Sequence, residues 1–158
     1  MLTDEQVQQI RPRLLTIQAI AAALIVEVLF LAGVLSAIVD WENVADRVKM
    51  LTLIGMIAGV FIYALSIVVP RVFASGTNLR PPTKVVDQYE IASTASTMMT
   101  EVLIRFALIN GAIFLNLMVF CIEIHVASLV VAAIGLLLMV AFFPRQSNMI
   151  SAIGDRLQ

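Results

Sequence analysis

Apolar residues in this chain come in four long blocks separated by short polar segments. The blocks cover residues 14–39, 50–69, 106–122 and 126–143. The first block contains one charged side chain, Glu27, and the other three blocks contain none. A helix needs about 20 mainly apolar residues to cross a bilayer. The pattern therefore predicts an all-α protein, a four-helix transmembrane bundle that forms a single integral membrane domain.

The two ends of the chain carry weaker helical signals. Residues 1–13 begin with the capping-box pattern T-D-E-Q and predict a surface helix that bends at Pro12 before the first span. Residues 144–158 form a tail after the last span. Three apolar residues of the tail share one helical face, which predicts a short amphipathic helix on the membrane: Ile150, Ile153 and Leu157.

The segment 70–105 between the second and third spans has two parts. It opens with a loop rich in glycine and proline. From Thr83 no breaker occurs before Gly111, which predicts a cytoplasmic helical extension of the third span. This extension is either a solvated or bundle-packed helix, or a docking surface for a protein partner around residues 89–100. Its hydroxyl side chains are Ser93, Thr94, Ser96, Thr97 and Thr100.

The first and third spans resemble each other. Placing TIQAIAAALIVEVLFLAGV (16–34) above TEVLIRFALINGAIFLNLM (100–118) gives seven identities in nineteen positions. The second span ends IVVPR and the fourth ends AFFPR. This favours an internal repeat of two tandem helical hairpins, related by an axis along the membrane normal. Chance similarity between apolar helices is the alternative.

Composition supports membrane insertion. Hydrophobic residues make up 61% of the 158 residues, charged residues 13%, and the mean hydropathy is +1.00. A water-soluble domain has about 25% charged residues. A soluble globule is therefore excluded, and membrane lipid is the expected surrounding of the spans.

Basic residues are unequally distributed between the two predicted sides. The positive-inside rule places the richer side in the cytoplasm, with both termini, in a bacterial inner membrane. Because these cations are dispersed, we expect no nucleic-acid partner. The terminal side carries Arg11, Arg13, Arg71, Arg80, Lys84, Arg105, Arg145 and Arg156, and the other side carries Arg47 and Lys49.

Polar residues near the span ends have simple expected roles. Trp41 follows the first span and predicts an interfacial anchor. Arg105 begins the third span and is expected to extend its charged group to the rim. Glu123 and His125 lie in the predicted turn between spans three and four, and we expect both to be exposed.

The sequence lacks the residue sets that several kinds of chemistry require. Cys121 is the one cysteine and His125 the one histidine, so the chain has no internal disulfide and no multi-cysteine or multi-histidine metal set. There is no nucleophile–base set and no phosphate-binding or dinucleotide motif. We therefore expect no enzyme, no cofactor and no metal site.

Glu27 is the candidate functional residue. It lies near the centre of the first span, where an ionised acid costs about 2.5–3.5 kcal/mol on insertion scales. Three residues at comparable predicted depth can donate to it: Tyr63, Asn110 and Asn116. We expect a proton- or ion-binding cluster of these four side chains. Either Glu27 titrates or binds a cation, or it only bonds a neighbouring helix.

Small residues recur on every predicted span. Helices in lipid associate through such residues because backbones can then approach closely. The expected helix-packing positions are Gly33, Gly55, Gly59 and Gly111. Four short spans enclose little volume, so a pore or site is expected to require a homo-oligomer.

Residues 27–37 resemble proteolipid ring subunits of rotary ATPases. Such subunits carry a mid-membrane acid on an ascending helix, followed six positions later by glycine and then by further small residues. Glu27, Gly33, Ser36 and Ala37 match this pattern. The resemblance implies that Glu27 is the carboxylate that carries a proton or sodium ion.

Two functions therefore remain open from the sequence. One is a small ion-handling membrane subunit, homo-oligomeric, with Glu27 as the titrating group. The other is a non-conducting structural or assembly subunit whose cytoplasmic helix docks a protein partner. The first is preferred because the depth of the acid agrees with both the physical argument and the resemblance.

Overall fold

The computed structural model describes residues 4–39, 41, 49–77 and 88–156, and the regular structure of these residues is entirely helical. This confirms the all-α prediction. Most of the charged loop between the first two spans, and residues 78–82 of the loop predicted after the second span, lie outside the described residues. The helices are α1 (Asp4–Ile38), α2 (Met50–Thr77), α3 (Gln88–Glu123), α4 (Val126–Ala141) and α5 (Gln146–Arg156).

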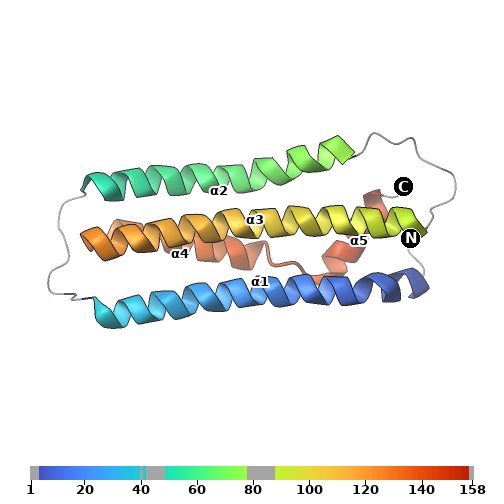
Figure 1. The fold of residues 1–158 in the computed structure, drawn as a ribbon, viewed down its shortest axis with the longest axis horizontal. Helices are drawn as coiled ribbons and strands as arrows, with labels where there is room; N and C mark the ends of the chain where they lie inside the picture. Colours follow the sequence, from blue (N-terminus) through green and yellow to red (C-terminus); the bar gives the residue numbers. More distant parts are fainter. Residues whose placement is uncertain (1–3, 40, 42–48, 78–87, 157–158) are drawn as a thin grey trace.

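The helices form an elongated bundle around α3 (Figure 1). Helix α3 packs against each of the other four, whereas α1 and α2 flank it without contacting each other within the described residues. One end of the bundle, here the turn end, contains the end of α1, the start of α2 and the α3–α4 turn. The opposite end, the terminal end, contains the first residues of α1 and the last of α5.

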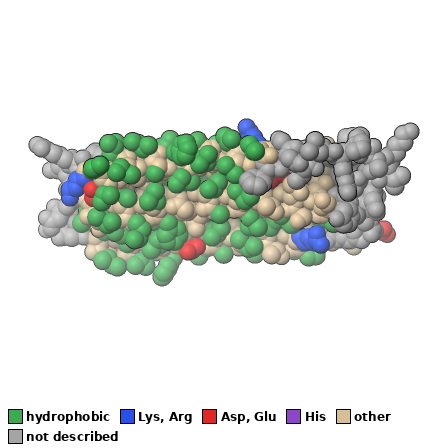
Figure 2. Space-filling model, turned by 45° about the horizontal axis from the view of Figure 1, so that its top comes forward, with side chains coloured by type: hydrophobic (Ala, Val, Ile, Leu, Met, Phe, Trp, Pro, Cys, Tyr) green, Lys and Arg blue, Asp and Glu red, His purple; other side chains and the backbone are tan. Residues whose placement is uncertain are grey.

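Three helices, α1, α2 and α3, are long and apolar enough to cross a membrane. Helices α4 and α5 would make a fourth crossing if taken together, although they meet at a bend of 66°. Hydrophobic side chains cover most of the face in Figure 2, and an acidic group lies within this apolar surface. These features indicate a membrane protein, with three or four crossings.

Helices α1 and α3 are longer than a bilayer requires. With 35 and 36 residues they extend about 50 Å, against about 30 Å of hydrocarbon. At the terminal end, α5 packs on both of them. The residues buried there form a second core, separate from the main one: Ile10, Leu14, Ile91, Ala95, Met98, Met149 and Ile153.

This second core changes two predictions. The tail was expected on the membrane surface, but α5 buries Met149 and Ile153 against protein. A bend was expected at Pro12, but α1 runs through it without interruption. Ile10 and Leu14 are both buried, so packing on each side of the proline holds the helix together.

The two predicted hairpins are not alike in structure. Helices α3 and α4 pack together, whereas α1 and α2 are separated by α3. Helix α2 also continues through Pro70 to Thr77, while α4 ends at Ala141, before its Pro-Arg pair. The prediction of a loop that begins at Pro70 is therefore wrong for residues 70–77, and the repeat remains a feature of the sequence alone.

Candidate functional site

Glu27 is exposed on the outer surface of α1. It lies 11 positions before Ile38, about 16 Å from the turn end. The neighbouring side chains Val26 and Phe30 are 63% and 72% exposed, so the acid stands within an apolar face. It makes no hydrogen bond or ion pair with any described residue. Among the described residues the carboxyl group therefore has no hydrogen-bonding or ionic partner.

The contact of Gln18 shows which side of α1 faces the rest of the bundle, and so on which side Glu27 lies. The Gln18 amide donates to the backbone oxygen of Pro144, at the α4–α5 junction, over 2.8 Å. Glu27 follows nine positions later, about two and a half turns, and so lies on the opposite side of α1. The acid is consequently directed away from the α4–α5 junction.

Tyr63 lies in the interior formed by α2, α3 and α4. Its hydroxyl donates to the backbone oxygen of Val131 over 2.9 Å, and its side chain is only 7% exposed. Gly135 makes room for the ring, because a Cβ there would overlap the Tyr63 hydroxyl. Tyr63 thus joins α2 to the backbone of α4.

Asn116 is fully buried in the same interior. Its amide nitrogen donates to Ala112 of its own helix over 2.9 Å. The side chain lies against two glycines of α2: a Cβ on Gly59 would come 2.6 Å from the Asn116 nitrogen, and one on Gly55 would come 3.5 Å from its oxygen. Gly59 therefore serves helix packing by accommodating the amide side chain, whereas Gly55 mainly accommodates Val119, whose Cγ2 would lie 3.1 Å from a Cβ there.

The four predicted site residues are not brought together in one chain. Tyr63 and Asn116 lie inside α2–α3–α4, while Glu27 lies on the outside of α1, which does not contact α2 in the described residues. Asn110 is half-buried, and its side-chain oxygen has no partner among the described residues. The expected hydrogen-bonded cluster is thus absent from the single chain, and the ion-binding role of these residues remains a prediction.

Gly33 and Gly111 differ from the two glycines of α2. A Cβ at either position would meet no described atom within 4 Å. Neither glycine is therefore needed for packing inside the single chain. Both present open, small-residue surface.

Glu123 has a structural role that the sequence analysis missed. Its carboxylate accepts from the backbone N–H groups of Leu51 and Thr52, over 3.2 and 2.7 Å, and from the Thr52 hydroxyl over 2.6 Å. These are donors in the first turn of α2, where a helix has unpaired N–H groups. Glu123 is 8% exposed, so the expectation of an exposed turn residue is wrong. The acid at the end of α3 caps a helix that begins 73 residues earlier in the sequence, at Met50, which local spacing does not reveal.

The α3–α4 turn contains a second cap and a constrained backbone. The Nδ1 atom of His125 accepts from the N–H of Ala127 over 3.1 Å and caps α4. Ile124 has a φ of 50°, which β-branched residues rarely adopt. The turn is tight because two helices must end and begin within two residues.

Arg105 connects three helices at the terminal side of the apolar region. Its Nε donates to the backbone oxygen of Ser66 on α2 over 3.3 Å, and its guanidinium carbon lies 4.9 Å from the ring centre of Phe142 after α4. The group is half-buried. It therefore packs against protein rather than only extending to the rim.

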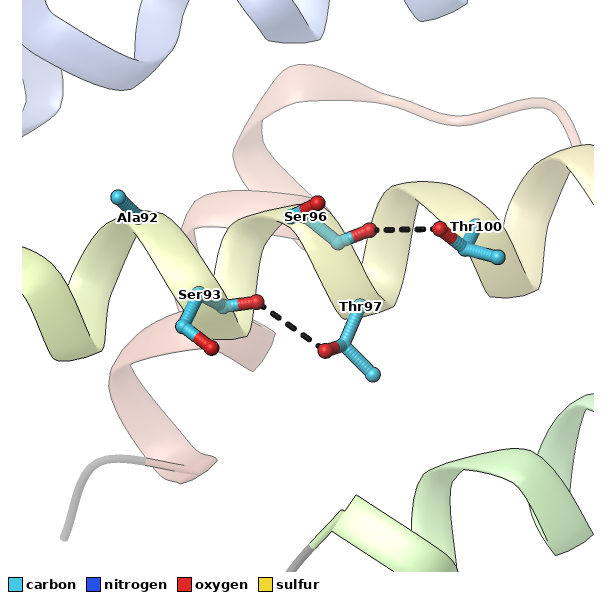
Figure 3. A pocket seen from close by; sticks show the side chains of 5 residues that line it. All are labelled: Ala92, Ser93, Ser96, Thr97 and Thr100. Carbon is cyan, nitrogen blue, oxygen red and sulfur yellow. Dashed lines mark hydrogen bonds between the residues drawn. The ribbon is translucent and has the colours of Figure 1, made fainter.

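An open depression of about 390 Å³ lies on the α3 extension (Figure 3). Two of its hydroxyls bond their own helix, Thr97 to Ser93 and Thr100 to Ser96. The lining residues are Ala92, Ser93, Ser96, Thr97 and Thr100, all from α3. No three His, Cys, Asp or Glu side chains of the described residues gather here or elsewhere as a set able to hold a metal ion.

Comparison with protein-family models, with curated proteins and with solved structures finds no match to this chain.

Proposed function

We propose that this chain is a small integral membrane subunit that handles protons or cations through Glu27, at a boundary between copies of itself. The observation that carries the proposal is the exposure of Glu27, without a partner among the described residues, inside the apolar face of α1. An intramembrane acid that faces lipid is costly, and such acids commonly mark ion or proton sites.

A neighbouring copy supplies what the single chain lacks. Helices approach closely in lipid where their surfaces carry small residues. Gly33 lies on the same helix as Glu27, and Gly111 lies on α3, and both have open surroundings. Asn110, beside Gly111, has a buried side-chain oxygen without a partner among the described residues, and it could accept from a neighbouring protonated carboxyl group once its side chain turned outward. A second copy placed on α1 would shield Glu27 from lipid and offer it hydrogen-bonding groups.

The chemistry of such a site is reversible protonation or cation binding at one carboxyl group. A protonated or cation-paired Glu27 can remain in the apolar region, whereas a bare carboxylate requires an aqueous contact. We place both termini in the cytoplasm of a bacterial inner membrane, following the asymmetry of basic residues.

The test is ion flux in sealed vesicles that contain purified protein. We expect wild-type protein to dissipate an imposed proton or sodium gradient and Glu27 to react with a carbodiimide. Glu27→Gln keeps the hydrogen-bonding shape but cannot titrate, so the flux should fall to the level of empty vesicles while the subunit number is unchanged. Glu5→Gln, at the exposed start of α1, is the matched control and should conduct like wild type. Absence of both wild-type flux and labelling would refute the proposal.

A second candidate is a non-conducting assembly subunit that docks a protein partner on the α3 extension. The observation in its favour is the hydroxyl-lined depression beyond the apolar region. Replacing Ser93 and Ser96 with leucine should then abolish copurification of the partner while leaving helix content unchanged. Retention of every copurifying protein by this variant would count against the second candidate.

A further inference from the structure

The buried polar side chains of the apolar region follow one internal line between α2, α3 and α4. Thr52, Ser66, Asn116 and Ser128 are all fully buried there, and Tyr63 nearly so. Most of their polar atoms have partners: Thr52 bonds Glu123, Ser66 bonds the backbone of Tyr63, and Tyr63 bonds Val131. These five side chains thus form a polar seam inside an otherwise apolar bundle.

Two atoms of this seam have no partner among the described residues, namely the side-chain oxygen of Asn116 and the hydroxyl of Ser128. An unpaired polar atom in the interior costs about 1–3 kcal/mol. Native proteins usually satisfy such atoms with protein or with an ordered water. The two orphan atoms therefore require an explanation.

The helix register places these two atoms at the same level of the bundle. Gly59 lies against both Asn116 and Val131, and Tyr63 lies against Gly135 one turn further along both helices. One turn in the other direction, the same register sets Ser128 beside residues 55 and 56 of α2. The Asn116 oxygen lies 3.5 Å from the position that a Cβ on Gly55 would occupy. The Asn116 oxygen thus faces Gly55, and the register places Ser128 at the same level of the bundle.

The geometry points to a water-binding site at this level, in which one buried water bridges the Asn116 oxygen and the Ser128 hydroxyl and joins α4 to α3. A buried water typically makes about three hydrogen bonds to groups that lack other partners. Here it donates to the amide oxygen and exchanges a second hydrogen bond with the hydroxyl, which can donate or accept. The site is separate from Glu27 and does not depend on the proposed function.

This site is tested by whether Ser128→Ala lowers or raises the melting temperature of the protein. If a water bridges the two atoms, Ser128→Ala removes one anchor, leaves Asn116 unpaired and lowers the melting temperature in detergent. If the Ser128 hydroxyl is an orphan, the same change removes a buried unsatisfied group and raises or preserves the melting temperature. Ser66→Ala is the matched control, because that equally buried hydroxyl bonds its own helix over 2.7 Å.

A double-mutant cycle gives the second test. Asn116→Leu removes both polar ends of the amide, so Ser128→Ala should produce a much smaller decrease in that background than in wild type. Equal decreases in both backgrounds would overturn the bridge. Should Asn116→Leu fail to fold, Asn116→Ala replaces it, since alanine also removes both polar ends of the amide.

A high-resolution structure of the wild-type protein in lipid gives the direct readout. We expect one ordered water within hydrogen-bonding distance of both atoms. A Ser128 hydroxyl bonded to a carbonyl of its own helix, with no solvent beside Asn116, would overturn the inference whatever the outcome of the flux experiment.

Discussion

At the scale of single residues, the turn end depends on groups that bridge helices distant in sequence. The start of α2 has no side-chain cap from its own preceding residue, Lys49, and instead receives the carboxylate of Glu123. Thr52 contributes both its N–H and its hydroxyl to that carboxylate. The cap therefore stabilises the α2–α3 pairing and the first turn of α2 together.

We predict that removing this cap lowers stability in graded steps. Thr52→Val deletes the hydroxyl but keeps both N–H donors, and should cost about 1 kcal/mol. Glu123→Gln should cost more, because it weakens all three hydrogen bonds at once. Thermal unfolding in detergent measures both changes. If the two variants unfold at the wild-type temperature, the cap contributes nothing to stability.

For Ile124 we predict a substitution that increases stability, in contrast to the two above. Its φ of 50° is unfavourable for a β-branched residue, and glycine adopts it at no steric cost. Ile124→Gly should therefore stabilise the protein by about 1 kcal/mol. Ile122→Gly, within α3, is the control and should destabilise it, since glycine weakens a helix interior. A lower melting temperature for Ile124→Gly would show that the Ile124 side chain contributes more by packing than its backbone costs.

At the scale of helices, glycines that look equivalent in sequence have different surroundings. Gly59 lies against Asn116 and Val131, whereas Gly111 has no described neighbour where its side chain would stand. We predict that Gly59→Ala costs about 1–3 kcal/mol through overpacking. Gly111→Ala should be neutral or stabilising by up to about 1 kcal/mol in the monomer. Unfolding of the two variants in a detergent that keeps the protein monomeric measures the difference.

The sequence predicted the helices well and their orientation poorly. Long apolar blocks define helices that a membrane can hold, and α2 and α4 begin where predicted. A helix that is apolar on all sides, however, does not reveal which side faces its neighbours. The position of Glu27 along its helix could therefore be predicted, but not its exposure. The partners of Glu123 depend on tertiary contacts that single-sequence patterns do not contain.

At the scale of the whole molecule, the described chain begins and ends at the terminal end of the bundle (Figure 1). Helices α1, α2 and α3 are long and apolar enough to cross a membrane, and α4 with α5 would make a fourth crossing if taken together. The same end carries the second core, which is formed by α1, α3 and α5. The bundle is thus held by two hydrophobic cores, one of them confined to the terminal end.

Cysteine labelling tests this topology. Exposed Cys121 is first replaced by serine, and single cysteines are then placed at Gln8, Lys49 and Ser147, all exposed. A membrane-impermeant maleimide added to intact cells should label Lys49→Cys only, and the other two should react after permeabilisation. Labelling of Ser147→Cys from outside would mean that α4 and α5 do not complete a crossing.

The separation of α1 from α2 has a consequence for synthesis. Each helix that contacts α1 is made later than α2. A ribosome-bound chain that has just released α2 therefore holds α1 in the bilayer without a native neighbour. Final docking of α1 must await the arrival of α3, and a break between Trp41 and Lys49 should leave two fragments that can reassemble when coexpressed.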